Sequence, residues 1–175
     1  SRGLGDVYKR QLSDHNTIAS GDYWYKLKKS DINNKTLEKY QESFGDWVET
    51  RTDGNETFVR LKTFEEYKSK LEKSDAFLII RSEEVTSSFE NKPVHINVTN
   101  IKEKIEPIKA NSVYEVMQQT LDAVHDQRKK FNIPMFAHIN HPNFGYGINA
   151  EDLKKLNGEQ FFEIYNGHPL SLIHI

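Results

Sequence analysis

Short apolar runs alternate with helical patterns from Ala76 onward, and this alternation is the sequence feature that most restricts the fold. Strands separated by helical segments are typical of α/β architecture. Four runs predict strands, at residues 76–80, 94–98, 134–139 and 161–165. Residues 112–131 and 149–156 have the spacing of helices, and Glu115 three residues after Ser112 predicts a capping box at the start of the first one. We therefore expect an α/β fold.

The alternation of residue types in the predicted strand 94–98 predicts which of its side chains are buried. Val94, Ile96 and Val98 occupy alternate positions, so they share one face of a strand. His95 and Asn97 share the opposite face. A strand with one aliphatic face is expected to pack that face against the core, which turns the polar pair either to a functional cavity or to solvent.

Residues 30–74 are richer in Lys and Glu than the segments around them. Asp53-Gly54 lies between runs of strand-forming residues and predicts a hairpin. Thr63 followed by Glu66 predicts a capping box at the start of a helix. We interpret residues 30–74 as a small inserted α+β segment that lies over the main sheet.

Composition excludes several classes of protein. With 175 residues, the chain is long enough for one domain. No apolar run approaches the ~20 residues that cross a bilayer. The net charge of -2, without a basic stripe, argues against a nucleic-acid partner. The absence of cysteine fits both a reducing compartment and export, so location stays open.

The two ends of the chain fit nothing around them. Residues 1–11 and 170–175 resemble translated adapter read-through of the kind found in metagenomic assemblies, and we set both aside as artefact tails. The alternative for the first is a genuine N-terminal tail. We expect the domain to occupy residues 12–169 and to be an internal fragment of a longer bacterial protein.

Polar clusters open the sequence or follow the predicted strands. They lie at residues 13–16, 81–84, 138–143 and 166–169. Side chains at the carboxyl ends of parallel strands converge on one face, so we expect these clusters to meet. Imidazole and carboxylate groups without thiols are ligands that suit Zn, Mn or Fe.

Most of these polar residues could instead have a purely structural role and bind nothing. His95 faces a cavity or solvent, and the other clusters favour the cavity. His141 is a turn residue or a ligand, and the His-Pro-Asn sequence favours a ligand. His138 is either a satisfied core histidine, which we favour slightly, or a direct ligand. Glu84 is either a ligand or a solvated carboxylate. Glu83 is expected on the solvated surface. Two further histidines are expected to have no function, His125 and His174.

Five motifs together resemble the PHP (polymerase and histidinol phosphatase) superfamily of metallohydrolases, and within it the carbaryl-hydrolase-like branch, whose members are often exported bacterial proteins. The motifs are Ser-Asp-His-Asn at 13–16, Glu-Glu-Val-Thr at 83–86, His-Ile-Asn at 95–97, Asn-His-Pro-Asn at 140–143, and Glu-Ile-Tyr-Asn-Gly-His-Pro at 163–169. The resemblance implies a distorted (β/α)7 barrel with two or three divalent metal ions at the strand ends. Export to the periplasm or out of the cell fits the resemblance, but the location of this protein stays open.

Carried over residue by residue, the resemblance implies four metal ligands, His15, Glu84, His95 and His141. Glu84 is the expected bridging and catalytic carboxylate. A second set is expected to orient ligands or to border the substrate, namely Asp14, Asn97, His138, Asn140, Asn143, Asn166 and His168.

The chain departs from the family pattern at both ends. The His-x-His pair of the first family strand and the Asp-x-His pair of the last are absent. Residues 12–169 are also fewer than the ~200–250 residues of a full barrel. The expectation is therefore a partial barrel that lacks its first and last strands and is itself inactive.

The implied function is a metal-dependent hydrolase that uses metal-activated hydroxide to cleave a small-molecule phosphoester, carbamate or other ester. The alternative from another class is a non-catalytic metal- or carbohydrate-binding module. A nucleic-acid phosphoesterase is a weaker alternative because of the acidic balance. Oligomeric state stays open.

Overall fold

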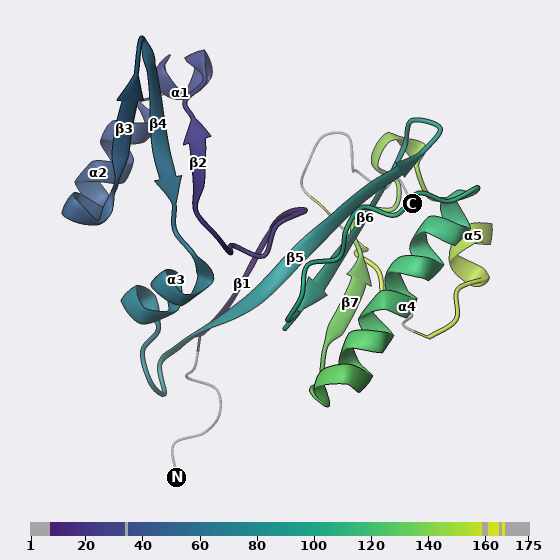
Figure 1. Ribbon diagram of the computed structural model, residues 1–175. Coiled ribbons are helices and arrows are strands. Elements are labelled where there is room, and N and C mark those ends of the chain that lie inside the picture. The colour runs from purple at the N-terminus through teal and green to yellow at the C-terminus, as the bar shows by residue number, and fades with distance from the viewer. Residues whose placement is uncertain (1–7, 34, 159–160, 165, 167–175) are drawn as a thin grey trace. The chain divides into compact units, whose positions relative to one another are not determined.

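The computed structural model describes residues 8–33, 35–158, 161–164 and 166 (Figure 1). The chain divides into two compact units, one formed by Ser1–Ile18 with Leu71–Ile175 and the other by Ala19–Lys70. The second unit begins at Ala19, earlier than the insertion expected at residues 30–74. The predicted metal ligands all lie in the first unit.

A four-stranded sheet forms the first unit, in the order β1-β5-β6-β7. Its strands are β1 (Tyr8–His15), β5 (Phe77–Phe89), β6 (Lys92–Thr99) and β7 (Phe136–Ile139). β1 pairs with β5 in parallel, whereas β5 with β6 and β6 with β7 are antiparallel. Residues 8–11, which we had set aside from the sequence, form the first half of β1.

The predicted (β/α)7 barrel is wrong. Within the described residues there are two open sheets, of four and three strands, and no closed barrel. The reason lies in the connection between β5 and β6, which is a tight turn at Glu90 and Asn91. Both residues have positive φ, 46° and 65°, as two-residue hairpin turns of type I′ require. Such a turn makes the strands antiparallel, whereas a barrel of this kind needs parallel strands joined by helical crossovers.

Two predicted strands differ from the observed ones. The run at 76–80 is only the beginning of β5, which continues to Phe89, so Glu83 and Glu84 lie within a strand and not at its end. The described part of 161–165 forms no strand, although Phe162 makes one parallel bridge to Ile139. Tyr165 lies outside the described residues.

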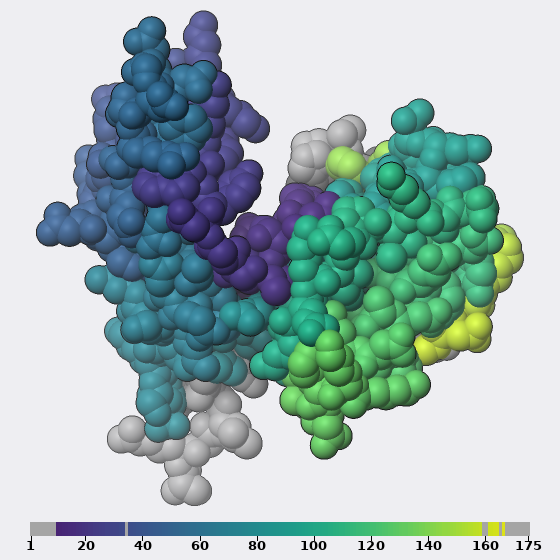
Figure 2. All heavy atoms as spheres, in the orientation of Figure 1, coloured from purple at the N-terminus to yellow at the C-terminus, as the bar shows by residue number. Residues whose placement is uncertain are grey.

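One face of the sheet carries the core of the first unit. Helix α4 (Val113–Phe131) packs against β5 and β6, and Figure 2 shows the green and teal residues of this unit closely packed. The aliphatic face predicted for residues 94–98 is confirmed, because Val94, Ile96 and Val98 are at most 1% exposed. They pack with residues from α4, β5 and β7, among them Val85, Val116, Met117, Val124 and Ala137.

Capping explains where the helices of this unit begin. The Ser112 side chain accepts a bond from the Glu115 N–H at 3.1 Å, as the sequence predicts. In a standard capping box the Glu115 carboxylate would accept a hydrogen bond from the Ser112 N–H. Here it accepts one from the Asn111 N–H instead. Helix α5 (Ala150–Lys154) begins after Asn149, whose side chain accepts from the Asp152 N–H. The 3₁₀ helix η3 (Phe144–Tyr146) precedes it.

The second unit contains a three-stranded antiparallel sheet in the order β2-β4-β3. Its elements are β2 (Tyr23–Lys26), α1 (Lys29–Asn33), α2 (Thr36–Phe44), the 3₁₀ helix η2 (Gly45–Trp47), β3 (Thr50–Asp53), β4 (Glu56–Leu61) and α3 (Phe64–Leu71). The predicted hairpin at Asp53-Gly54 is confirmed, since Asp53 pairs with Glu56. The predicted capping box is also confirmed, because the Thr63 N–H donates to Glu66 and the Glu66 N–H donates to Thr63.

No helix in the described ranges is both long and apolar enough to cross a membrane.

Candidate metal centre

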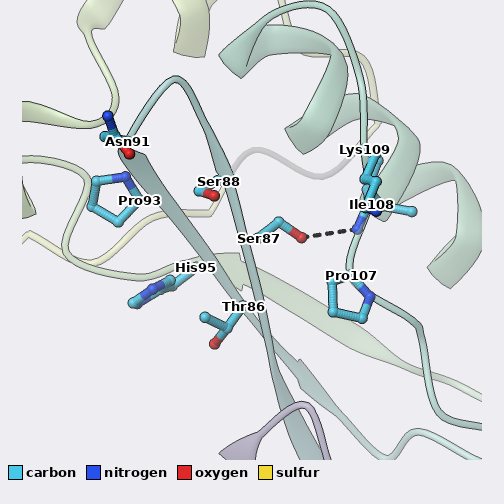
Figure 3. Close-up of a pocket in the computed structure, with 9 residues that line it drawn as sticks. All are labelled: Thr86, Ser87, Ser88, Asn91, Pro93, His95, Pro107, Ile108 and Lys109. Carbon is cyan, nitrogen blue, oxygen red and sulfur yellow. Dashed lines mark hydrogen bonds between the residues drawn. The ribbon is translucent and has the colours of Figure 1, made fainter.

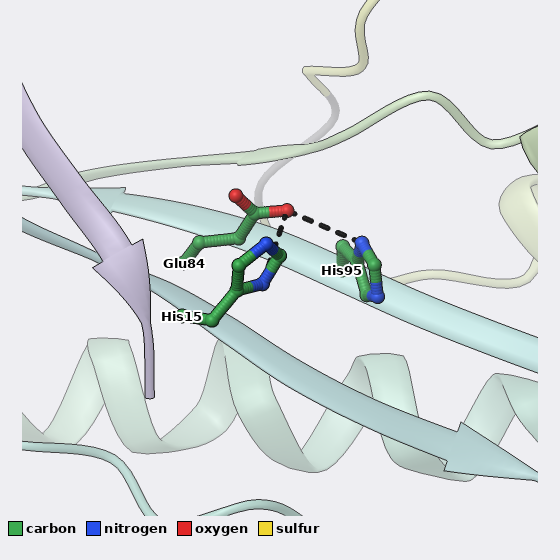
Figure 4. Close-up of side chains that lie close together, drawn as sticks. All are labelled: His15, Glu84 and His95. Carbon is green, nitrogen blue, oxygen red and sulfur yellow. Dashed lines mark ion pairs between the residues drawn. The ribbon is translucent and has the colours of Figure 1, made fainter. Parts of the chain in front are cut away.

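Strand register gathers the candidate ligands on one face of the first unit's sheet. His15 at the end of β1 pairs with Glu84 on β5, and Glu84 pairs with Asn97 on β6. Because paired residues point to the same side, these side chains share the face opposite the core. His95, two residues before Asn97, lies on that face as well. His15, Glu84 and His95 converge in Figure 4.

Glu84 is the centre of this group. Its Oε1 lies 3.2 Å from His95 Nδ1, 3.6 Å from His141 Nε2 and 3.8 Å from His15 Nδ1. His95 Nδ1 and His141 Nε2 are 3.3 Å apart. His141 comes from the turn that follows β7, where its backbone has a φ of 23°. We call Glu84, His15, His95 and His141 the histidine cluster.

The four members of the histidine cluster differ in exposure. The side chains of Glu84, His95 and His141 are 13%, 12% and 15% exposed, whereas that of His15 is 62% exposed. Phe144 packs its ring against both inner histidines, with centroids 5.0 Å from His141 and 6.1 Å from His95. His15 is instead held by Thr86, whose Oγ1 lies 2.5 Å from His15 Nδ1.

Amide side chains surround Glu84 on the side of β7. Asn97 Nδ2 donates to Asn140 Oδ1 at 2.8 Å and lies 3.4 Å from His138 Nε2. Asn140 in turn hydrogen-bonds Glu84. Two buried atoms here have no hydrogen-bond partner among the described residues, Asn97 Oδ1 and His138 Nδ1. The polar groups beside the histidine cluster are therefore only partly satisfied by the protein.

Ionisation of Glu84 is favoured despite its burial. Burial by itself would raise the pKa of this carboxyl, but hydrogen bonds from His95 and Asn140, with the nearby charge of His15, lower its pKa to about 2. Burial lowers the pKa of His138, which favours the neutral ring. An ionised carboxylate beside imidazoles is the protonation state in which these groups bind a cation.

The histidine cluster fits a divalent metal ion. Tetrahedral sites with metal–ligand bonds of about 2.0–2.1 Å place their donor atoms about 3.3 Å apart. The separations among Glu84, His95 and His141 are 3.2, 3.3 and 3.6 Å. Nitrogen and carboxylate donors without sulfur suit Zn, Mn or Fe. His15 lies slightly farther out, at 3.8 Å from Glu84.

The remaining predicted site residues lie at different distances from this centre. Asp14 pairs in register with Glu83, so it faces the other side of the sheet from His15, although we expected it to orient the ligands. Asn143 directly precedes η3 in the loop after His141. Asn166 Nδ2 donates to Glu163. His168 lies outside the described residues.

The prediction for Glu83 was wrong. This carboxyl is 0% exposed, on the core face, where its Oε2 accepts the Ile105 N–H at 2.9 Å. Burial raises the pKa of Glu83 to about 7. The hydrogen bond from the Ile105 N–H lowers the pKa, but this effect is smaller than that of burial. Glu83 and Glu84 are consecutive, so strand alternation places them on opposite faces with opposite pKa shifts.

Three residues that support the histidine cluster were not identified from the sequence. Asn16 binds both backbone groups of Thr86, which holds the position of His15. Glu163 accepts the His141 N–H at 2.9 Å. Glu163 begins the last motif of the resemblance but was given no role there, because its long separation from His141 conceals their contact.

A pocket adjoins the histidine cluster at Thr86 and His95 (Figure 3). Its volume is about 470 Å³, within the range of small-molecule sites. The other walls come from the end of the β5–β6 hairpin and from residues 107–109, where Ser87 Oγ accepts the Ile108 N–H at 3.0 Å. Lys109 supplies a positive charge at the wall opposite Asn91.

No family model, curated protein or solved structure matches this chain.

Proposed function

We propose that this chain binds a divalent transition-metal ion, Zn, Mn or Fe, through the histidine cluster, and that the centre serves a hydrolase acting on a small-molecule phosphoester or related ester. The observation that carries the proposal is the position of Glu84 Oε1, within 3.2–3.8 Å of nitrogen atoms from three histidines. The motif resemblance to PHP metallohydrolases supports the same assignment, although the described residues form no closed barrel.

A divalent ion at this place would supply Lewis acidity, which acidifies water and polarises the oxygen under attack. Glu84 provides the negative charge that holds the cation, and Asn140 orients that carboxylate. Phe144 packs against His95 and His141 and restricts the positions of their rings. The pocket at Thr86 and His95 is where a substrate would lie against the centre.

His15 distinguishes the hydrolase from a binding module. Structural zinc sites use four protein ligands, whereas catalytic sites use three and leave one position open. Glu84, His95 and His141 are mostly buried and close together, whereas His15 is exposed and held by Thr86. A site with three strong ligands and a replaceable His15 favours the hydrolase.

Metal content tests the assignment. The protein is refolded with Zn²⁺, dialysed, and its bound zinc measured by atomic emission. We expect about one zinc per chain in the wild type after dialysis and loss of most of it in Glu84→Ala or His141→Ala. Glu83→Gln is the matched control, since it changes the next residue on the opposite face and should retain zinc. Equal zinc in the wild type and in both cluster variants would contradict the proposal.

A second measurement separates catalysis from binding. A chromogenic phosphate monoester and an aryl ester are incubated with the zinc-loaded wild type, with and without chelator. Hydrolysis that the chelator and Glu84→Ala both abolish supports the hydrolase. Tight zinc binding without hydrolysis, combined with loss of zinc in His15→Ala, would support the closed site of a non-catalytic module.

A further inference from the structure

The side chain of Glu163 continues the hydrogen bonding of the sheet beyond the point where the backbone hydrogen bonds of the sheet end. The Ile139 N–H donates to the Phe161 carbonyl at 3.0 Å, and the Glu163 N–H donates to the Ile139 carbonyl at 2.8 Å. Two residues farther along, the His141 N–H donates to the carboxylate of Glu163 at 2.9 Å. The side chain of Glu163 thus takes the place of a backbone acceptor.

His141 needs such an acceptor because its backbone leaves strand geometry. Its φ of 23° is outside the regions that a non-glycine residue occupies without strain. The hydrogen bond to the Glu163 oxygen satisfies the His141 N–H in this position and so stabilises the conformation. Asn166 Nδ2 in turn donates to both oxygens of Glu163, at 3.3 and 3.1 Å, and fixes the carboxylate.

The opposite edge of the sheet is built in the same way. At the end of β1, Asn16 has a φ of 52°, and its side chain accepts the Thr86 N–H at 2.8 Å and donates to the Thr86 carbonyl at 3.1 Å. On both edges, a side chain completes the sheet beside a histidine of the cluster. This recurrence indicates that such bonds position the histidines.

We propose that Glu163 is a positioning residue that sets the metal affinity of the histidine cluster by holding the backbone of His141. The inference rests on the proposed metal site. Glu163 acts through the location of its carboxylate oxygen and not through its net charge. Loss of a group that orients a metal ligand typically weakens metal affinity 10–100-fold.

Three substitutions separate position from charge. Glu163→Gln removes the charge and keeps an oxygen at the same reach, whereas Glu163→Asp keeps the charge and withdraws the oxygen by one methylene. Glu163→Ala removes both. Zinc dissociation constants are measured by competition with a chromophoric chelator, in the wild type and in the His141→Ala background. Thermal melts of the metal-free proteins check that each variant folds.

We expect Glu163→Asp and Glu163→Ala to weaken zinc binding by about 10–100-fold, and Glu163→Gln by less than about fivefold. In the His141→Ala background the same changes should alter the residual affinity by less than about twofold, since the ligand they position is gone. In NMR spectra of the metal-free protein, the chemical shift of the His141 amide proton should change in Glu163→Asp and Glu163→Ala. It should stay near the wild-type value in Glu163→Gln.

Opposite results would overturn the inference. If Glu163→Asp binds zinc as the wild type does and Glu163→Gln does not, charge and not position is responsible. Equal losses in both backgrounds would show that Glu163 does not act through His141. If the wild type binds zinc and Glu163→Ala binds it equally well, the inference is refuted but the proposed metal site is not. If the wild type binds no zinc, both the inference and the proposed function are refuted.

Discussion

The pair Glu83 and Glu84 allows one prediction to be worked through from the structure. Glu83→Gln replaces a carboxyl that is fully buried on the core face by an amide of the same shape. The Gln oxygen can accept the Ile105 N–H as Glu83 does. The substitution therefore removes the ionisation of this group and little else.

The magnitude follows from the pKa of Glu83, which burial raises from 4.5 to about 7 in the folded protein. Below pH 4.5 the carboxyl is neutral in both the folded and the unfolded state. Between pH 4.5 and 7 only the unfolded chain loses the proton, so the free energy of unfolding falls as pH rises. The whole change amounts to about 3 kcal/mol at most, because one pKa unit corresponds to about 1.4 kcal/mol.

Urea unfolding of the metal-free protein, followed by circular dichroism at pH 4.5, 6, 7 and 8.5, measures this effect. We expect Glu83→Gln to match the wild type within about 1 kcal/mol at pH 4.5 and to exceed its stability by about 1–3 kcal/mol at pH 8.5. A stability difference that stays constant over this pH range would refute the reasoning.

Glu84→Gln should show the opposite sign, which makes it the matched comparison. The pKa of Glu84 is about 2 in the folded protein, because its hydrogen bonds and neighbouring charge outweigh burial. Its ionised form therefore stabilises the fold above pH 4.5, and that stabilisation is lost as pH falls towards 2. Glu84→Gln is thus expected to be less stable than the wild type at pH 7, in the presence of chelator.

Three further predictions concern other parts of the molecule. Ile96→Ala should lower the unfolding free energy by about 2–5 kcal/mol in urea titrations, because Ile96 is fully buried, whereas the exposed Ile164→Ala should change it by less than about 0.5 kcal/mol. Zinc at 100 times its dissociation constant should stabilise the wild type by about 2.7 kcal/mol and raise its melting temperature, and Glu84→Ala should lose this shift. In the second unit, hydrogen bonds from Arg60 lower the pKa values of Glu49 and Glu66 to about 2, so stability present above pH 4.5 should be lost as pH falls towards 2, and Arg60→Met should flatten this dependence. The fluorescence of the two tryptophans, Trp24 and Trp47, reports this loss, because both lie in that unit.

Local periodicity explains what could be predicted from the sequence. The faces of residues 94–98 follow from strand alternation, and the start of α4 follows from Ser112 and Glu115. The hairpin of the second unit was visible because Asp53-Gly54 is a strong turn signal. Each of these features is set by residues close together in sequence.

The barrel could not be corrected from the sequence because the deciding turn has a weak signal. Glu90 and Asn91 lack the glycine that marks most two-residue hairpins, yet both adopt positive φ. The polar residues 81–84 also look like the end of a strand, since they interrupt the apolar run. They continue β5 because its two faces meet a core on one side and the histidine cluster on the other.

The candidate ligands converge for a different reason from the one that the sequence suggested. Strand ends were expected to bring them together, but Glu84 and His95 lie inside antiparallel strands, and their register makes them neighbours. Any sheet that pairs β5 with β6 through the Glu90-Asn91 turn places Thr86 opposite His95 and Glu84 opposite Asn97. A one-residue slip would send the valines of β6 to the polar face and the histidine to the core. The burial of Val94, Ile96 and Val98 therefore fixes the position of His95, and the apolar core specifies the geometry of the histidine cluster on the opposite side of the same strands.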